Sequence, residues 1–433
     1  MKWMKHAPMA LVCALMVTAG LAPAPASAEE ETEAVQAGVA SVDITPEMPI
    51  RLSGYGARQE EATEIAQPLY AKALAFGGGD APLSVLMSVD LIGAPGWLTD
   101  EIGARLNERF DLDPANLAIC ATHTHAGPVI RRTIPDLFGD PPAEDEQGRI
   151  DRYTDALVEN LENVAAAAVE DMGEARLAWA QGSVDFAVNR RVIEDGVWTG
   201  FGVAPEGPVD HDVPVLAVHG ADGALRAVLF NYACHCTTLT GTSNVVHGDW
   251  AGEAAARIEA AHEGVTALVA IGCGGDANPY PRGSMEDVER HGATMAEEVS
   301  RVLADSLTPL PEAPRGARTE VALPFADGGE LPYTIQTWTF GDELAMVFLP
   351  GEVTVDYALR FKRELDEERL WVNAYANGAP CYIASSRVIA EGGYEADSSM
   401  QYYGQPGPFD PVIEDIIVEA VHGLLTPAFA PAE

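Results

Sequence analysis

Leu117-Ala-Ile-Cys-Ala-Thr-His-Thr-His-Ala-Gly-Pro128 indicates the architecture to expect of this 433-residue chain. Its first part, Leu117–Ala121, is an unbroken apolar run, which predicts a strand buried on both faces, as in sheets covered by helices. Gly127-Pro128 ends the strand, so two histidines are expected at an open sheet edge. Similar runs predict further strands at Val39–Ile44, Ala71–Phe76, Leu83–Ile92, Val213–Val218, Ala224–Ala233, Val265–Ile271, Leu344–Leu349 and Trp371–Tyr375.

Amphipathic segments with helical periodicity alternate with these strands. The alternation predicts an α/β fold of layered mixed β-sheets flanked by helices, in a single large domain over residues 37–428. A stretch rich in Pro, Gly and acidic residues, 126–148, is expected to be a long loop that lines a site. Helices are expected at Leu98–Phe110, Asp151–Ala168, Trp250–Ala261, Met285–Leu307, Val353–Asp366 and Pro411–Leu425.

Residues 1–28 have the pattern of a secretory signal peptide. Lys2 and Lys5 precede an apolar run, 9–21, that is too short to span a bilayer, and Ala26-Ser27-Ala28 forms a small-x-small cleavage site. Residues 29–36 would then be a flexible acidic start. We therefore expect an exported protein, periplasmic or extracellular, with no integral membrane segment.

The chain is strongly acidic, with 26 Lys and Arg against 66 Asp and Glu and a formal net charge of −40 at pH 7. A surface with this charge repels phosphate backbones, so nucleic acid is not an expected partner. The acidity is expected to aid solubility rather than to recruit a partner. The sequence leaves the oligomeric state open.

Two expected strands end in histidines. His123 and His125 are spaced i, i+2 and so lie on one side of a continuing strand. One metal ion can accept both rings, or accept one while the other acts as an acid, a base or an oxyanion donor. His235 lies between Cys234 and Cys236, but strand neighbours point to opposite faces, so the three cannot easily share one metal. We expect these cysteines to be small buried residues.

Acidic and phenolic side chains occupy the remaining strand ends. Asp276 follows a glycine turn that permits close approach of a ligand, but the Gly-Lys-Ser/Thr of a phosphate loop is missing. Glu352 is either a structural carboxylate at a helix start or the oxygen ligand that two histidines need for a zinc site. Tyr382 and Tyr394 either pack in the protein or offer phenols to a metal or an oxyanion.

Taken together, these clusters resemble the catalytic domain of the neutral ceramidases, secreted zinc amidases that split ceramide into sphingosine and fatty acid. The resemblance extends over about residues 37–425. Residues 122–128, Thr-His-Thr-His-Ala-Gly-Pro, resemble the family signature His-Thr-His-Ser-Gly-Pro closely. The other matching pieces are short and persuade as a set: Gly38–Pro46, Ser53-Gly54-Tyr55-Gly56, Asn189-Arg190, Val209-Asp210 with Val215-Leu216, His235, Gly351-Glu352, and the tyrosine pair Tyr382 and Tyr394.

The resemblance implies a site with one zinc ion per chain. It assigns the zinc to four ligands: His123, His235, Glu352 and Tyr382. It assigns the substrate amide and its oxyanion to three donors: His125, Arg190 and Tyr394.

Two departures from the family pattern weaken the case for ceramide itself. Asn278 stands where the family has a serine implicated in catalysis, and the expected domain organisation lacks the family's C-terminal immunoglobulin-like domain. Both departures leave a zinc amidase plausible. From the resemblance we expect the amide of ceramide or of a ceramide-like lipid to be hydrolysed to a fatty acid and an amine. Zinc would activate a water and polarise the carbonyl, with Asp276 accepting the proton or orienting the water and Asn278 orienting it through its amide.

Three alternatives belong to other classes. The same zinc hydrolase scaffold could act on another small amide or an ester, a short polar pocket being its mark. A non-catalytic binding protein is disfavoured because no expected ligand is missing. A serine hydrolase is disfavoured because the Gly-x-Ser-x-Gly motif is absent from the sequence.

Overall fold

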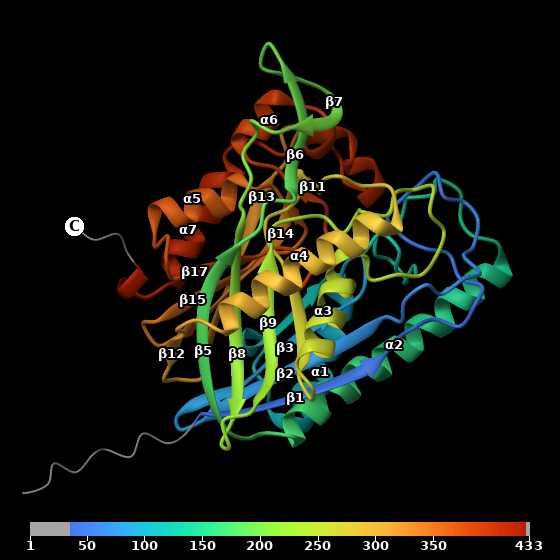
Figure 1. Cartoon of the computed structure of the whole chain (residues 1–433). Coiled ribbons are helices and arrows are strands. Elements are labelled where there is room, and N and C mark those ends of the chain that lie inside the picture. Colours follow the sequence, from blue (N-terminus) through green and yellow to red (C-terminus); the bar gives the residue numbers. More distant parts are fainter. Residues whose placement is uncertain (1–34, 430–433) are drawn as a thin grey trace, which may run out of the picture. The chain divides into compact units, whose positions relative to one another are not determined.

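Most of the predicted apolar runs lie in a nine-stranded mixed sheet in the computed structural model, which describes residues 35–429 (Figure 1). The β3–β4 and β9–β10 pairs are parallel, and most of the other pairs are antiparallel. The strand order is β10 (Thr266–Ile271), β9 (Leu225–Tyr232), β8 (Asp212–Gly220), β5 (Gly173–Ser183), β1 (Gln36–Asp43), β2 (Tyr70–Gly78), β3 (Ala81–Val89) and β4 (Leu117–Ala121), with β12 (Thr308–Leu310) beside β5.

A second, four-stranded sheet packs on one face of the first. It comprises β13 (Arg315–Pro324), β14 (Glu330–Phe340), β15 (Leu344–Phe348) and β17 (Leu370–Asn373). The two sheets share a dry apolar layer in which Phe76 of the first sheet meets Trp338 and Phe340 of the second edge-to-face, with ring centroids 6.5 and 6.0 Å apart. Such aromatic contacts stabilise a sheet interface beyond the burial of area alone.

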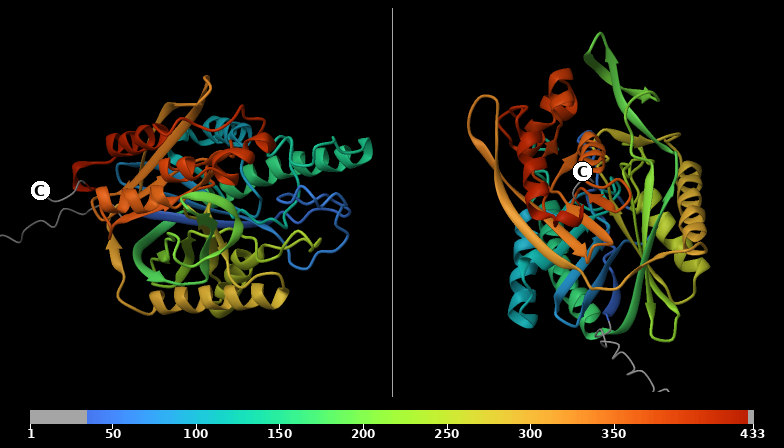
Figure 2. Two further views of the ribbon diagram at one scale, coloured as in Figure 1. Left: turned by 90° about the horizontal axis from the view of Figure 1, so that it is seen from above. Right: turned by 90° about the vertical axis from the view of Figure 1, so that its left-hand side faces the viewer.

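Helices cover the outer faces of both sheets (Figure 2). The nine-stranded sheet is covered by α1 (Gly96–Phe110), α2 (Glu144–Glu170), α3 (Asp249–Ala261) and α4 (Met285–Leu303). The four-stranded sheet is covered by α5 (Asp356–Glu364) and α7 (Ile413–Leu424). The prediction of layered mixed sheets flanked by helices in one domain is confirmed. Within residues 35–429, no helix combines the length and apolar character needed to cross a bilayer.

The start of α2 was predicted wrongly. The helix begins at Glu144 rather than Asp151, so the loop expected over 126–148 ends earlier. Residues 144–149 lack apolar periodicity, which is why the pattern missed them. Three acidic residues, Glu144, Asp145 and Glu146, occupy the first turn, where carboxylates stabilise the positive end of the helix dipole.

Several strands were not predicted, and they matter for the site. A small sheet has the order β11 (Ala277–Pro279), β6 (Ala187–Glu194) and β7 (Val197–Ala204). A two-stranded sheet joins β16 (Glu352–Val353) to β18 (Tyr382–Ile383). β7 is largely exposed, β11, β16 and β18 are two or three residues long, and β6 carries two buried arginines. None of them therefore has the apolar run that revealed the central strands.

The five cysteines of the described residues are all buried and unpaired, as predicted for Cys234 and Cys236. The expected signal peptide and residues 29–34 of the expected acidic start lie outside the described residues, and β1 begins at Gln36.

Candidate metal and active site

The two histidines at the predicted strand ends are held in one tautomer. The Nδ1 atom of His123 lies 2.7 Å from the Ile92 carbonyl oxygen, and Nδ1 of His235 lies 2.6 Å from the Gly274 carbonyl oxygen. A carbonyl can only accept, so each Nδ1 carries the proton and the lone pair of each ring is on Nε2. Ligand histidines are oriented in this way by partners outside the metal site.

Glu352 brings a carboxylate oxygen to both lone pairs. Its Oε2 lies 3.2 Å from Nε2 of His123 and 3.0 Å from Nε2 of His235. Three acceptor atoms that converge in this way repel one another unless a cation lies between them. Two imidazole nitrogens and one carboxylate oxygen are a donor set that zinc sites in proteins use. The chemistry of this donor set therefore fits zinc.

The protonation of His235 suits a metal ligand. Burial, reinforced by the nearby Arg190 guanidinium and opposed by Glu352, lowers the pKa of His235 to about 4. Burial opposes the ionisation of Glu352, but the adjacent histidines hold the pKa of its carboxyl well below the usual range. Near pH 7 the pair is a neutral imidazole and a carboxylate, the forms that bind metal ions.

Tyr382 lies beside Glu352 because β16 and β18 pair in parallel with these two residues in register. Its hydroxyl lies 3.4 Å from Nε2 of His235 and accepts a hydrogen bond of 3.0 Å from Nη2 of Arg190. All four side chains assigned to zinc by the resemblance therefore meet at one point.

Arg190 reaches the same point from β6 with a buried side chain. Its Nη1 lies 3.1 Å from Nε2 of His235 and donates to Oδ1 of Asn278 at 3.3 Å, while its Nε donates to Glu395 at 2.8 Å. The guanidinium is thus fixed beside the expected ligands by contacts with His235, Asn278 and Glu395.

His125 stands beside His123, with their Nε2 atoms 3.1 Å apart. The ligand atoms of His123, His125 and His235 all lie within 4.8 Å of one another. These three histidines and the expected ligand set of His123, His235 and Glu352 have His123 and His235 in common. Nδ1 of His125 is buried without a partner in the described part of the chain. His125 can therefore serve as a further ligand or, as predicted, as a donor to the substrate.

Gly54 makes room for the His125 ring, and its replacement by alanine is expected to impair both folding and activity. Gly54 has φ +95°, and an added Cβ would lie 2.5 Å from Nδ1 of His125. Gly139 is a matched control, because its φ is +76° but nothing lies within 4 Å of an added Cβ. Gly139→Ala should cost about 1 kcal/mol of stability through the left-handed backbone alone. Gly54→Ala should cost more and lower kcat by about 10²-fold, since displaced catalytic groups lose that much.

Urea unfolding and steady-state kinetics of the two variants separate the effects. Equal kcat values for Gly54→Ala and Gly139→Ala would show that the position of His125 does not matter for the reaction.

Asp276 is fully buried, and its carboxylate is engaged by other groups. Oδ1 accepts from the Val355 backbone at 2.9 Å, and Oδ2 accepts from Asn189 at 2.9 Å and Arg387 at 3.4 Å. The backbone carbonyl of Asp276 accepts from the Arg190 backbone amide. These contacts favour a residue that positions β6 against the segment that follows Glu352. Its role as proton acceptor stays a prediction.

Burial, with the nearby Asp356 carboxylate, raises the pKa of Asp276 from 3.8 to about 6, against the opposing Val355 amide and Arg387. Between pH 4 and 6 the native state then binds more protons than the unfolded state. The protonated Asp276 carboxyl therefore contributes fully to the stability below pH 4, and its contribution is lost as the pH rises through 6. The stability of the wild type relative to Asp276→Asn should fall by about 2 kcal/mol between pH 4 and 7. Urea unfolding across this pH range tests it, with exposed Glu206→Gln as control, and a flat difference would contradict it.

Asn278 lies on β11, opposite Val188 of β6. Its Oδ1 accepts from Nη1 of Arg190 at 3.3 Å and from the hydroxyl of Thr237 at 3.2 Å. Both partners are donors, so the amide is oriented with its oxygen toward them and its Nδ2 hydrogens remain for another acceptor. The amide is thus placed to contact a water or a substrate oxygen.

Tyr394 reaches the site by ring packing. Its ring lies edge-on to that of Tyr382, with centroids 5.5 Å apart, and the Arg190 guanidinium lies 5.9 Å from its centroid. Burial raises the pKa of Tyr394, so its hydroxyl stays protonated and can donate at neutral pH. All nine predicted site residues therefore lie at or beside one point, with Asp276 in the layer behind it.

Two further residues complete the site and were not predicted. The hydroxyl of Tyr403 donates to Oε1 of Glu352 and leaves Oε2 for the histidines. Glu395 accepts from Nε of Arg190 and, at 2.5 Å, from Arg191. Glu395 directly follows Tyr394, so adjacency was a signal, whereas no pattern in the sequence marks Tyr403.

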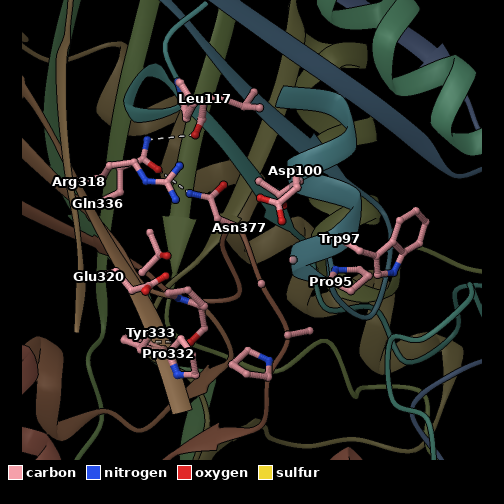
Figure 3. Close-up of a pocket in the computed structure, with 18 of the residues that line it drawn as sticks. Pro95, Trp97, Asp100, Leu117, Arg318, Glu320, Pro332, Tyr333, Gln336 and Asn377 are labelled. Atoms are coloured by element: carbon pink, nitrogen blue, oxygen red, sulfur yellow. Dashed lines mark hydrogen bonds between the residues drawn. The ribbon is translucent and has the colours of Figure 1, made fainter. Parts of the chain in front are cut away.

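A cavity of about 370 Å³ lies behind the site rather than within it (Figure 3). Arg318, Glu320 and Tyr333 line it, and none of the predicted site residues does. On its wall Gln336 donates to the Leu117 carbonyl and accepts from Asn377. These bonds hold the loop around Asn377, whose next residue, Gly378, accepts a hydrogen bond from the backbone amide of Gly351 in the Gly351–Glu352 turn.

Comparisons with known proteins identify the family and the fold of the chain. The family model described as neutral/alkaline non-lysosomal ceramidase, N-terminal, matches residues 35–284. The crystal structure of neutral ceramidase from Pseudomonas aeruginosa is 17% identical, with a TM-score of 0.73, and the match covers 93% of this chain and 76% of that one. A structure of ceramidase complexed with C2 is 16% identical, with a TM-score of 0.74, and the match covers 92% and 77%. No curated protein matches.

Proposed function

The chain belongs to the neutral/alkaline non-lysosomal ceramidase family, and from that premise we propose that it is a zinc-dependent amidase. Its substrate is the N-acyl amide of ceramide or of a ceramide-like lipid, which it hydrolyses to a free fatty acid and an amine. The family and the fold make it a ceramidase-type hydrolase. The observation that carries the zinc proposal is the convergence of two oriented Nε2 lone pairs on one carboxylate oxygen.

One zinc ion per chain would be held by His123, His235 and Glu352, with Tyr382 as a weaker fourth ligand. Bound there, zinc would supply a Lewis acid for the amide carbonyl and a water of lowered pKa. Glu352 is kept in place by Tyr403, and each histidine by a backbone carbonyl. These contacts orient the three side chains toward one point.

The remaining residues bind the amide and stabilise its charge. Arg190 and Tyr394 donate to the developing oxyanion, and His125 donates from the other side of His123. Fixed donors of this kind typically contribute about 10²–10³-fold each to kcat. Asn278 orients the attacking water through its free Nδ2, and Asp276 holds β6 and the Glu352 turn together or accepts the proton of that water.

One observation favours a second candidate, a smaller amide or ester as substrate. The cavity that borders His123 and Glu352 has a volume of about 10 Å³. This volume is too small for an acyl chain. We infer that the substrate enters past Tyr394 and Asn278, which are partly exposed, and a short polar compound could also do so.

We also propose that the protein is exported, periplasmic or extracellular, after cleavage behind Ala28. This rests on the charged start, the apolar run and the Ala-Ser-Ala site of residues 1–28. N-terminal sequencing of the protein secreted by its natural host tests it, and an intact Met1 would contradict it.

The activity is tested by fatty acid release from a panel of N-acyl compounds, ceramides included, with and without a chelator. We expect chelator-sensitive cleavage of ceramide that zinc restores, and loss of cleavage in His123→Ala. Cleavage of short or polar amides alone would keep the mechanism and assign the second candidate. One bound zinc per chain without any cleavage would reject the substrate class, and no zinc would reject the site.

A further inference from the structure

The hairpin of β6 and β7, residues 187–204, exposes apolar side chains on its second strand. Val197 is 58% exposed, Phe201 54% and Val203 50%. In Figures 1 and 2 this hairpin extends away from the layers of sheets and helices. Seven large apolar side chains of the described residues are exposed, and three of them fall within the eight residues of β7. Single exposed apolar residues need no explanation, but such a concentration indicates a contact surface.

The edge of this strand is also unprotected. β7 is the last strand of its sheet, and its sequence Val-Trp-Thr-Gly-Phe-Gly-Val-Ala contains neither a charged residue nor proline. Proteins commonly protect such edges with lysine, proline or inward charges. An uncharged apolar edge strand left open in this way is suited to an environment other than bulk water.

The exposed surface is continuous with the candidate site. The Phe201 ring lies edge-on to Tyr394, with centroids 5.0 Å apart, and the Arg190 guanidinium lies 5.1 Å from the centre of that ring. The strand is anchored by Trp198 on Gly393, where an added Cβ would lie 2.3 Å from the indole. β7 therefore contacts the candidate site through Phe201 and continues outward from it.

The charges of the hairpin restrict the occupant. Its two cations, Arg190 and Arg191, are buried and paired with Glu395. The turn carries Glu194 and the exposed Asp195, and the whole chain has a net charge of −40. Anionic membranes would repel such a surface, whereas an uncharged or zwitterionic lipid surface would accept it. A second copy paired along β7 would instead cover Phe201 and close the opening beside Tyr394.

We propose that β7 docks this protein on a zwitterionic lipid surface, with Val197, Phe201 and Val203 in contact with the acyl chains. This inference rests on the proposed function, because it takes the substrate to be a lipid. Docking there places the lipid surface against the side of the site where Phe201 meets Tyr394, so the amide of a lipid reaches the site without an internal tunnel. The narrow cavity behind His123 is consistent with this route.

Flotation of the purified protein with substrate-free phosphatidylcholine vesicles tests the proposal. Val197→Ser/Val203→Ser should bind the vesicles about tenfold more weakly, since two half-buried valines contribute that much. Ile65→Ser is the matched control, because Ile65 is 43% exposed but lies outside the hairpin. All three proteins should hydrolyse a water-soluble short-chain amide equally, since none of these residues touches the site.

Equal vesicle binding by the wild type and the double variant, or no binding by the wild type, would overturn the proposal. Binding that requires anionic lipid would also overturn it. A larger molar mass for the wild type than for the double variant in light scattering would overturn it as well, and would assign the surface to a second copy. Lost vesicle binding in the double variant together with no amide hydrolysis by the wild type would retain the docking surface and reject the proposed reaction.

Discussion

Replacing Glu352 by glutamine is expected to lower kcat/KM by about 10³-fold or more and to remove stoichiometric zinc. Glutamine keeps the size of the side chain and an oxygen that can accept from Tyr403. It loses the negative charge that two neutral imidazoles cannot replace. Lewis-acid stabilisation of several kcal/mol corresponds to at least this loss of rate.

Metal content by mass spectrometry and fatty acid release check this result together. Glu320→Gln is the control, because Glu320 is an exposed carboxylate in the cavity behind the site and faces no histidine. Glu320→Gln should retain both zinc and activity. Retention of one zinc per chain by Glu352→Gln, with little change in rate, would remove Glu352 from the ligand set.

Replacing Arg190 by lysine is expected to lower kcat by about 10²–10³-fold, the usual loss on removing an oxyanion donor. Lysine keeps the charge, but a single ammonium cannot reproduce the fork that joins Tyr382, Asn278 and Glu395. Stability should fall as well, because one of the two ion pairs of the buried Glu395 is weakened.

Arg191→Lys is a close control for this prediction. Arg191 also pairs with Glu395, but its other bonds go to Glu391 and the Gly392 carbonyl. The control should therefore lose stability in urea unfolding while keeping most of its kcat. Equal losses of kcat in the two variants would show that Arg190 acts through the fold alone.

The central strands and the residues at their ends were predictable because each signal is local. The apolar runs that become β3, β4, β9 and β10 are visible in stretches of a few residues, and their ends carry His123, His235 and Asp276. Helix α2 was mistaken by seven residues at its start, where acidic capping rather than apolar periodicity stabilises the first turn.

The strands that hold Arg190 were not predictable in the same way. β6 and β7 belong to a separate small sheet with β11, and the pairing of β6 with β7 contains bulges. Neither an apolar run nor strict alternation therefore marks these strands in the sequence. Tyr403 was missed because a tyrosine that orients a carboxylate resembles in sequence any tyrosine used for packing.

By itself, the sequence determined the layered α/β architecture and the chemistry available at its strand ends, because hydrophobic periodicity and residue type act over a few neighbouring positions. The tertiary structure alone decided which of those groups meet. His235 and Glu352 are 117 residues apart and come within 3.0 Å only through the packing of the sheets and the β16–β18 register. Tautomers, lone-pair directions and shifted pKa values follow from such long-range contacts, because they depend on which groups surround each buried side chain.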